Sequence, residues 1–461
     1  MSKRIFFKFI FISIITLVTF SSCKKEEINS VNLEFFPDTL LFDYDVDTNT
    51  VVLNCFGDIQ TTWSLSSLPS YINVSPTSGT LTPGQSITLN VILDRSGFVS
   101  NDTYLDAIVI TYKSGANYTT LTTQVKNFKQ KKILLYKDVV DAEFDENGDR
   151  IVFVSSNPGS LNVIQTFQNP ILSSVVLPYV PLCVSLSPSG NEAVIGHDGR
   201  ISIVDLINMQ VTQTYNISCQ SYDIVHGGNG WAYVFPANLQ WTKIHCINLA
   251  TGAETKSTGI SIYGNTKAKL YPLGNFIYGA DKLSPSDIEK YDITAGTADY
   301  LYDSPYHGEY NFAGDIWFSK NNNILFSKGR TTVNTSLNQS QDMIYQGTLI
   351  APFLGSSYSY LTGMYQPNSN NKILCIFSTG TLLNIQADSS LYIIDATTLA
   401  NSTRISYEPF LSPLNTLPDR FVPALGHFVF GSPIGNKAYV LTKAQAGSGI
   451  TYDWALQVIN Y

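Results

Sequence analysis

The feature that most constrains the fold of this chain is a repeat in its second half. From residue 139 to residue 461 the sequence divides into seven units of about 46 residues, close to the ~40–45 residues of a four-stranded propeller blade. Within a unit, short apolar strands alternate with polar turns rich in Asn, Gly and Ser, which supply the backbone conformations that tight hairpins need. The units begin near Val139, Pro181, Gln220, Thr266, Phe312, Tyr360 and Phe421. This period predicts a radial β architecture.

The two ends of this region are expected to close a ring. The seventh unit supplies three strands, the last of them near 454–458, while residues 131–137 read as a strand without a partner in the first unit. Pairing the two would remove an exposed sheet edge. We therefore predict that 131–461 is a seven-bladed propeller with amino-terminal strand closure, with six or eight blades as alternatives. In blade layout alone it resembles propellers of the YVTN/WD40-like kind, and no Trp-Asp signature closes its blades.

Residues 31–126 carry a different pattern. The stretch 85–93 alternates apolar and polar residues throughout, and 106–112 reads as a further strand. Turn residues at 76–79 and 82–84 separate such strands at a spacing near ten residues, which is typical of a β-sandwich. With 27 Tyr and 25 Phe, the composition also favours sheet. The predicted fold class is therefore all-β, an immunoglobulin-like sandwich followed by a propeller.

The sandwich region resembles the BACON family of immunoglobulin-like modules. The resemblance lies in 63–65 (Trp-Ser-Leu), in 71–81, which contains Val-Ser-Pro-Thr-Ser-Gly, and in 83–86 (Pro-Gly-Gln-Ser). Tyr71 stands where a tryptophan is common in that family. The family is associated with carbohydrate binding, although its members often act as spacers. The resemblance implies that Trp63 and Tyr71 either stack on a sugar ring or, as is more usual for tryptophan in such a sandwich, belong to the core.

Residues 1–22 read as a lipoprotein signal peptide. A basic start at Lys3, Arg4 and Lys8 precedes the apolar run 10–20, which is shorter than the ~20 residues that span a bilayer. Ser21-Ser22-Cys23 then resembles a lipobox, so Cys23 is the expected lipidation site and would carry acyl chains such as palmitate. An ordinary cleavable signal is the alternative.

The tether expected at 23–30 carries its own signal. The run Cys-Lys-Lys-Glu-Glu at 23–27 resembles the signal that exports some lipoproteins to the outer face of the outer membrane, whereas a plain charged tether would look similar. We expect a protein that meets the membrane only through its lipid, anchored in the outer membrane and exposed at the cell surface.

The charge of the chain excludes one class of partner. The formal net charge is −8, and removing 1–22 takes away three basic residues, which leaves 25 basic against 36 acidic residues, or −11. Because phosphate backbones repel such a chain, we expect no nucleic-acid partner.

Familiar catalytic, cofactor and metal signatures are absent from the sequence. It has no HExxH, P-loop, GxGxxG or GxSxG pattern, and we expect no cofactor. Asp43, Asp45, Asp47 and Asn49 have the spacing of a calcium loop but lack its turn glycine and final glutamate. Their period of two instead indicates the solvated face of a strand, so we expect no metal site.

Candidate ligand residues lie on loops that we expect over the propeller channel. The connection 300–310 carries four tyrosines, 330–342 is polar, Trp241 follows a short loop, and 407–426 is long and proline-rich. Aromatic rings that pack on sugar C–H groups, with polar groups that hold hydroxyls, suit an oligosaccharide, whereas tyrosines that only cover blade junctions would look the same. The candidates are Trp241, Tyr302, Tyr306, His307, Tyr310, Arg330, Asp419 and Arg420.

These features favour a surface-tethered, non-catalytic binding lipoprotein that recognises a glycan or an envelope protein on the propeller loop face. The alternative is a propeller glycoside hydrolase or polysaccharide lyase, which needs two facing carboxylates, or a pair such as Tyr306 and His307, at the channel mouth.

Overall fold

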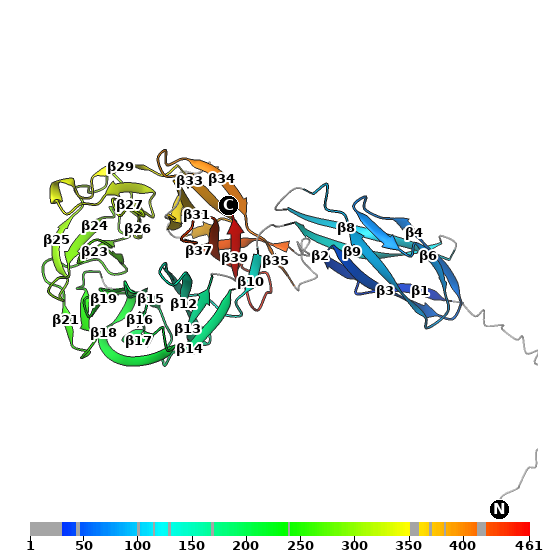
Figure 1. The fold of residues 1–461 in the computed structure, drawn as a ribbon, viewed down its shortest axis with the longest axis horizontal. Helices are drawn as coiled ribbons and strands as arrows, with labels where there is room; N and C mark the ends of the chain where they lie inside the picture. The colour runs from blue at the N-terminus through cyan, green and yellow to red at the C-terminus, as the bar shows by residue number, and fades with distance from the viewer. Residues whose placement is uncertain are drawn as a thin grey trace, which may run out of the picture. The chain divides into compact units, whose positions relative to one another are not determined.

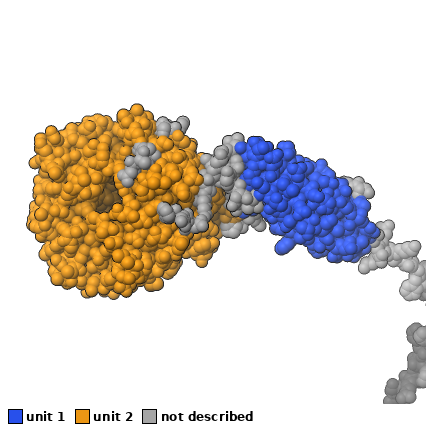
Figure 2. Space-filling view, in the orientation of Figure 1, with its two compact units in different colours: residues 1–98, 103–126 blue, residues 99–102, 127–461 orange. Residues whose placement is uncertain are grey.

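The structure is a computed structural model in which the chain forms two compact units, residues 1–98 with 103–126 and residues 99–102 with 127–461 (Figure 2). It describes residues 30–42, 47–98, 102–113, 116–127, 131–166, 170–237, 240–350, 359–367, 371–381, 384–412 and 421–461. In these ranges the regular structure is strand, apart from the 3-10 turn η1 (Gln339–Gln341) (Figure 1). The predicted all-β fold class is confirmed. Among the described residues, there is no helix that is long and apolar enough to cross a membrane.

The first unit is a sandwich of two sheets. Their strand orders are β1-β3-β7-β5 and β2-β9-β8-β4-β6, and β2 joins β9 in parallel. The strands are β1 (Val31–Phe36), β2 (Thr39–Phe42), β3 (Thr48–Gly57), β4 (Thr61–Ser67), β5 (Ile72–Ser75), β6 (Ser78–Leu81), β7 (Ser86–Leu93), β8 (Asp102–Tyr112) and β9 (Asn117–Asn127).

Alternation along the strands builds the sandwich core. In β1 every second side chain is buried, and β5 and the second half of β7 follow the same rule. Trp63 is only 3% exposed and belongs to this core, which confirms the core interpretation of that residue. Tyr71 is partly buried against Phe98 and Tyr104, and its hydroxyl donates to Asp106.

The described residues of the second unit form seven blades of four strands each, with a fifth strand in blade 6. Blade 1 is β11 (Asp141–Asp145), β12 (Arg150–Ser156), β13 (Gly159–Gln165) and β14 (Ile171–Val176). Blade 2 begins with β15 (Cys183–Leu186), β16 (Glu192–Gly196) and β17 (Asp198–Asp205). Blades 2 and 3 share β18 (Gln210–His226), and blade 3 continues with β19 (Trp231–Pro236), β20 (His245–Asn248) and β21 (Glu254–Lys256). Blade 4 is β22 (Lys267–Leu270), β23 (Phe276–Ala280), β24 (Ile288–Asp292) and β25 (Asp299–Asp303).

The remaining blades follow in chain order. Blade 5 is β26 (Ile316–Phe318), β27 (Ile324–Ser327), β28 (Thr331–Asn334) and β29 (Tyr345–Thr348). Blade 6 is β30 (Ser359–Tyr365), β31 (Lys372–Thr381), β33 (Ser390–Asp395) and β34 (Asn401–Ser406), with β32 (Asn384–Ala387) paired to β31. A small sheet of β35 (Phe410–Leu411) and β36 (Phe421–Val422) precedes blade 7, which is β37 (Ala424–Gly431), β38 (Lys437–Ala444), β39 (Trp454–Asn460) and β10 (Lys131–Leu134).

Strand β10 closes the ring as predicted. It pairs antiparallel with β39, with Ile133 opposite Leu456 and Leu134 opposite Ala455, and so becomes the outer strand of blade 7 (Figure 1). The Lys132 ammonium lies 3.0 Å from a carboxylate oxygen of Glu408, and both side chains are about nine-tenths buried. The ring therefore has no open sheet edge at its junction.

Blades pack face to face, so their middle strands are apolar on both sides. The five central residues of β12 are all buried, as are those of β13. A buried cluster of Val and Ile side chains joins blade 1 to blade 2, and equivalent clusters follow around the ring. Polar side chains are therefore concentrated on the innermost and outermost strands.

Candidate functional site

The first strands of the blades surround a central channel, which the space-filling view shows as an opening in the second unit (Figure 2). Inside it lies a cavity of about 250 Å³. Six charged side chains line the cavity: Asp141, Glu143, Asp223, Lys267, Lys269 and Asp315. Aromatic side chains complete much of the lining, namely Phe144, Trp317, Tyr365, His427, Phe428 and Phe430.

Strand geometry explains why these charges face inward. Side chains two residues apart lie on the same face of a strand. Asp141 and Glu143 alternate in this way along β11, and Lys267 and Lys269 alternate along β22 of blade 4. The channel thus receives an acidic pair from blade 1 and a basic pair from blade 4.

Two ion pairs connect these groups. The Lys267 ammonium lies 3.1 Å from Asp223 Oδ1, and the Lys269 ammonium lies 3.4 Å from Glu143 Oε1. Both lysines are therefore already partnered by a carboxylate.

Most channel carboxylates also fasten one blade to the next. Asp141 Oδ2 accepts the Val184 N–H at 3.0 Å, and Glu143 Oε2 accepts the Leu186 N–H at 2.8 Å, so both reach from β11 to β15. In the same way Asp223 Oδ2 accepts the Ala268 N–H at 2.8 Å. The inner strand of a blade is a sheet edge, and these bonds satisfy N–H groups that face the channel.

Asp315 is the exception among the channel carboxylates. Its Oδ1 accepts the N–H of the adjacent Ile316 at 2.9 Å, and among the described residues its carboxylate makes no bond to the following blade and no ion pair. Its side chain is partly exposed to the cavity. Among the four channel carboxylates, Asp315 therefore makes the fewest contacts with the rest of the described chain.

The channel environment shifts the protonation of these groups. Burial raises the pKa of Asp141, Glu143 and Asp315, an effect that the nearby lysines oppose. Burial alone would lower the pKa of Lys267, but Asp223, Asp141 and Asp315 raise it well above its usual range. The carboxylates of the channel thus keep Lys267 in its charged form.

His427 is a different kind of lining group. Burial, with Lys443 nearby, lowers the pKa of its imidazole to about 4. The side chain is therefore uncharged at neutral pH.

A second cavity of about 340 Å³ continues the channel and shares Lys269, Trp317, Met364 and Tyr365 with the first. At its far side Glu146 of blade 1 forms an ion pair with Lys320 of blade 5 and accepts the Tyr365 hydroxyl at 3.0 Å. These contacts connect blade 1 with blades 5 and 6 across the ring.

The sequence-predicted ligand residues that the structure describes do not line the channel cavity. Trp241 lies between β19 and β20, is 64% exposed and packs edge-on against Tyr263. Arg330 donates to the carbonyl oxygens of Ser359 (3.0 Å) and Leu349 (3.1 Å), which links the end of blade 5 to blade 6.

Tyr302 belongs to a buried ionic network between blades 4 and 5. Its hydroxyl donates to Asp342 Oδ2 at 3.0 Å, and the Lys290 ammonium lies 2.7 Å from the same oxygen. Tyr278 donates to both oxygens of Asp342. Lys290 is 1% exposed at its side chain and Asp342 0%, so this network is structural.

Tyr306 and Tyr310 form an aromatic cluster with Tyr345. Tyr310 stacks on Tyr345 with ring centroids 4.2 Å apart, and Tyr306 meets Tyr310 edge-on at 4.6 Å. The Tyr306 hydroxyl accepts the Tyr345 N–H at 3.0 Å. These rings cover the junction of blades 4 and 5.

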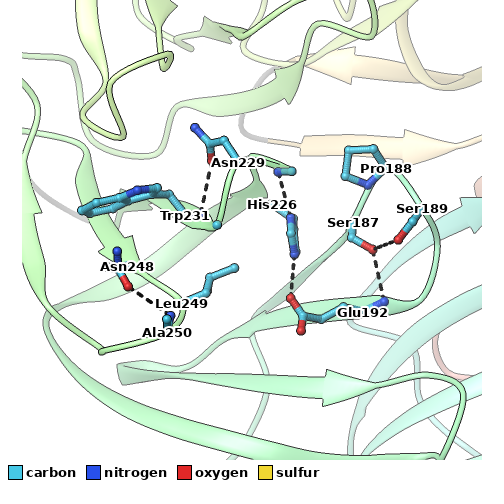
Figure 3. A pocket seen from close by; sticks show the side chains of 12 residues that line it. Ser187, Pro188, Ser189, Glu192, His226, Asn229, Trp231, Asn248, Leu249 and Ala250 are labelled. Atoms are coloured by element: carbon cyan, nitrogen blue, oxygen red, sulfur yellow. Dashed lines mark hydrogen bonds and ion pairs between the residues drawn. The ribbon is translucent and has the colours of Figure 1, made fainter.

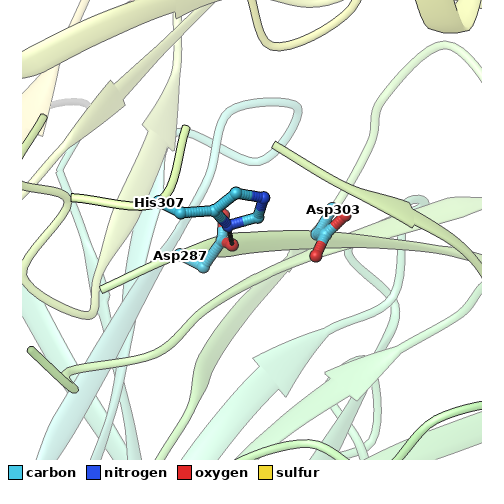
Figure 4. Close-up of side chains that lie close together, drawn as sticks. All are labelled: Asp287, Asp303 and His307. Carbon is cyan, nitrogen blue, oxygen red and sulfur yellow. Dashed lines mark ion pairs between the residues drawn. The ribbon is translucent and has the colours of Figure 1, made fainter. Parts of the chain in front are cut away.

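His307 lies beside two carboxylates at the edge of blade 4 (Figure 4). Its Nδ1 is 3.3 Å from Asp287 Oδ2, and one ligand atom from each of Asp287, Asp303 and His307 lies within 4.8 Å of the others. Asp287 already accepts the Ser304 hydroxyl and the Ile288 N–H. Three protein ligands are the number found in catalytic zinc sites, where a water completes the coordination, but here His307 is exposed and Asp287 is already hydrogen-bonded.

A separate cavity of about 730 Å³ lies among hairpin turns of blades 2 and 3 (Figure 3). There His226 Nδ1 accepts the Gly228 N–H, so its Nε2 carries the proton that it donates to Glu192 Oε1 at 2.9 Å. Asn229 and Asn248 are likewise hydrogen-bonded within their own surroundings. The polar groups of this larger cavity are thus used in holding turns together.

Three predicted residues, Cys23, Asp419 and Arg420, lie outside the described residues. Sequence reasoning in turn missed the six charged channel residues. The available signal was the alternation of charges on the first strand of a repeat unit, Asp-Ala-Glu at 141–143 and Lys-Ala-Lys at 267–269.

Comparison with known proteins adds a likeness of fold. No protein-family model matches the sequence, and no curated protein matches it either. Among solved structures the chain is similar to Kuenenia stuttgartiensis hydrazine synthase, with a TM-score of 0.51 and 13% sequence identity over 70% of this chain and 95% of that chain. At that identity the likeness shows a shared propeller-like fold alone.

Proposed function

We propose that this protein is a non-catalytic binding lipoprotein, tethered to the cell surface of the outer membrane through Cys23, whose propeller recognises a glycan in its central channel. The observation that carries the proposal is the cavity of about 250 Å³ lined by carboxylates, lysines and Trp317. Small-molecule sites are concave, with a few convergent polar groups beside apolar and aromatic surface. Aromatic faces and charged hydrogen-bonding groups together suit a hydroxylated sugar ring.

The contacts of the carboxylates support binding over turnover. Asp141, Glu143 and Asp223 each accept a backbone N–H from the next blade. A general acid or base must exchange protons with a substrate, whereas these groups are engaged in holding the ring together.

A glycan array probed with the full-length protein in detergent tests this function. We expect binding to a restricted set of glycans and at least a tenfold loss of affinity in Trp317→Ala, whose side chain lines the channel. Trp241→Ala, which changes an exposed tryptophan of blade 3, is the matched control and should bind normally. Absence of binding to any glycan would contradict the proposal and leave an envelope protein as the partner to be sought by crosslinking.

The lipid tether has its own test. Cys23→Ser should lose labelling by a palmitate analogue and move from the membrane to the soluble fraction, and protease added to intact cells should digest the wild-type protein. Unchanged membrane association of the variant would contradict the lipid anchor.

A propeller glycoside hydrolase or polysaccharide lyase is the second candidate. The observation that favours it is that Asp141 and Asp315, from blades 1 and 5, line the same cavity and both have a raised pKa, as a general acid requires. Release of reducing ends or unsaturated products from a bound glycan, lost in Asp315→Asn, would establish this activity in place of the first.

A further inference from the structure

The charges of the channel point to the chemical class of its ligand, an inference that rests on the proposed function. The cavity receives four carboxyl groups but only two lysines. Asp223 holds Lys267, and Glu143 holds Lys269, which leaves Asp141 and Asp315 without an ion pair among the described residues. The lining is therefore short of positive charge.

The two carboxyls without an ion pair lie among the other charges of the channel. Asp141 lies near Lys267, Lys269 and Asp223, and its only direct partners in the described chain are the N–H groups of Ala142 and Val184. Asp315 lies near the same three charges and near Lys328. If either lysine moved to Asp141 or Asp315, the carboxylate that it now pairs with would lose its counter-ion.

The burial of these two carboxyls is consistent with a lack of positive charge around them. Burial raises the pKa of both Asp141 and Asp315 despite the lysines. A buried carboxylate without a counter-ion is costly, and a cation placed beside it offsets that cost.

We propose that the channel selects a glycan unit that bears a free ammonium group, an amino sugar, and that Asp315 with Asp141 binds that ammonium. Asp315 directly precedes β26 and Trp317 lies within it, and both line the cavity, so one short segment offers the ammonium a carboxylate and the sugar an aromatic side chain. The cavity is slightly smaller than the ~300–1,000 Å³ of most small-molecule sites, which suits one ring at a time.

A bare metal ion fits the channel less well. Among the described residues, the carboxylate and imidazole atoms close enough together to share an ion are those of Asp287, Asp303 and His307, none of which lines the channel cavity. Among the described residues the channel carboxyls therefore form no group of three that could share one ion.

Calorimetry with two matched probes tests the inference. The full-length protein in detergent is titrated at neutral pH with a glucosamine tetramer and with its N-acetylated counterpart. We expect the free-amine probe to bind at least tenfold more tightly, and added salt to weaken its binding but not that of the acetylated probe.

Two substitutions assign the preference to residues. Asp315→Asn should lose most of the preference for the free amine, with binding of the acetylated probe unchanged, and Asp141→Asn provides a second variant if the first is unstable. Asp198→Asn, which removes a charge from an exposed position of blade 2, is the control and should keep the preference.

The outcomes separate the inference from the function on which it rests. Equal binding of both probes, or tighter binding of an acidic glycan on the array, overturns the amino-sugar inference and leaves glycan binding intact. Failure to bind any glycan overturns both. A preference that survives in both aspartate variants also overturns the inference, because the ammonium must then bind elsewhere.

Discussion

The sandwich and the propeller use polar side chains in opposite ways. In the sandwich, alternate residues of β1 point to solvent, and the core between the sheets is almost entirely apolar. In the propeller, the middle strands are buried on both faces and charges collect on the inner strands, where the side chains of blades 1, 3, 4 and 5 meet in the channel. The same alternation thus turns side chains to solvent in one region and into the channel cavity in the other.

The two regions also differ in where they bury charge. Lys290 and Asp342 pair at 2.7 Å inside the propeller, with side chains that are 1% and 0% exposed. Arg95 and Asp47 pair at 2.6 Å on the sandwich, where the Asp47 side chain is 59% exposed. A propeller junction therefore depends on a charge pair in a way that the sandwich does not.

The largest predicted effect tests this contrast between a buried and an exposed charge pair. Asp342→Ala leaves the Lys290 ammonium buried without its carboxylate and should lower the free energy of unfolding of the propeller by about 3–5 kcal/mol. Asp47→Ala in the sandwich should cost less than about 1 kcal/mol, because water replaces the exposed partner. Scanning calorimetry of both variants checks the difference, and equal losses would contradict it.

A second prediction asks whether the two units unfold independently. Leu456 and Leu53 are both 0% exposed, one in the propeller strand that carries the closure and one in the sandwich core. Each Leu→Ala substitution should cost about 2–5 kcal/mol, but only in its own unit. Denaturant unfolding should show one transition shifted and the other unchanged in each variant, whereas a shift of both would mean that the units are coupled.

Gly190 tests the junction of blades 1 and 2. Its φ is +74°, and an added Cβ would lie 2.5 Å from the carboxyl group of Asp145, which pairs with Arg150 at 2.8 Å. Gly190→Ala should cost about 1–3 kcal/mol. Gly230→Ala is the control, with φ +86° and no atom within 4 Å of the new Cβ, and should cost about 1 kcal/mol from the backbone alone. Thermal unfolding compares the two variants, and equal costs would remove the clash from the explanation.

The smallest predicted effect is a pH dependence from the channel. The folded-state pKa of Asp141 is raised, so the folded protein holds this proton more tightly than the unfolded chain does. Its contribution to stability is present at low pH and is lost as the pH rises from the usual value of an aspartate toward the folded-state pKa. Asp141→Asn should therefore lose less stability than the wild type over that range, measured as melting temperature against pH. A larger loss in the variant would contradict the raised pKa.

Periodicity predicted the architecture, whereas it carries little information about which side chains line the channel, for a physical reason. Strand pairing is visible in the sequence, because the last unit lacks a fourth strand and residues 131–137 read as a strand without a partner. Their pairing with 454–458 followed from these two facts. Ligand contacts depend instead on which blades face each other. Tyr302 and Arg330 looked like free loop groups, but they bind Asp342 and two backbone carbonyls, because neighbouring blades bring those partners to them.

The most direct test of this account asks where the ligand enters. Thr362 lines the channel cavity, and Trp241 is exposed on an outer loop of blade 3. Thr362→Cys and Trp241→Cys, each labelled with a bulky maleimide, are compared in binding to the glycan that the array selects, with maleimide-treated wild type as the reference. The account predicts that labelling at 362 abolishes binding and labelling at 241 leaves it unchanged; the reverse result would place the site on the loops and contradict it.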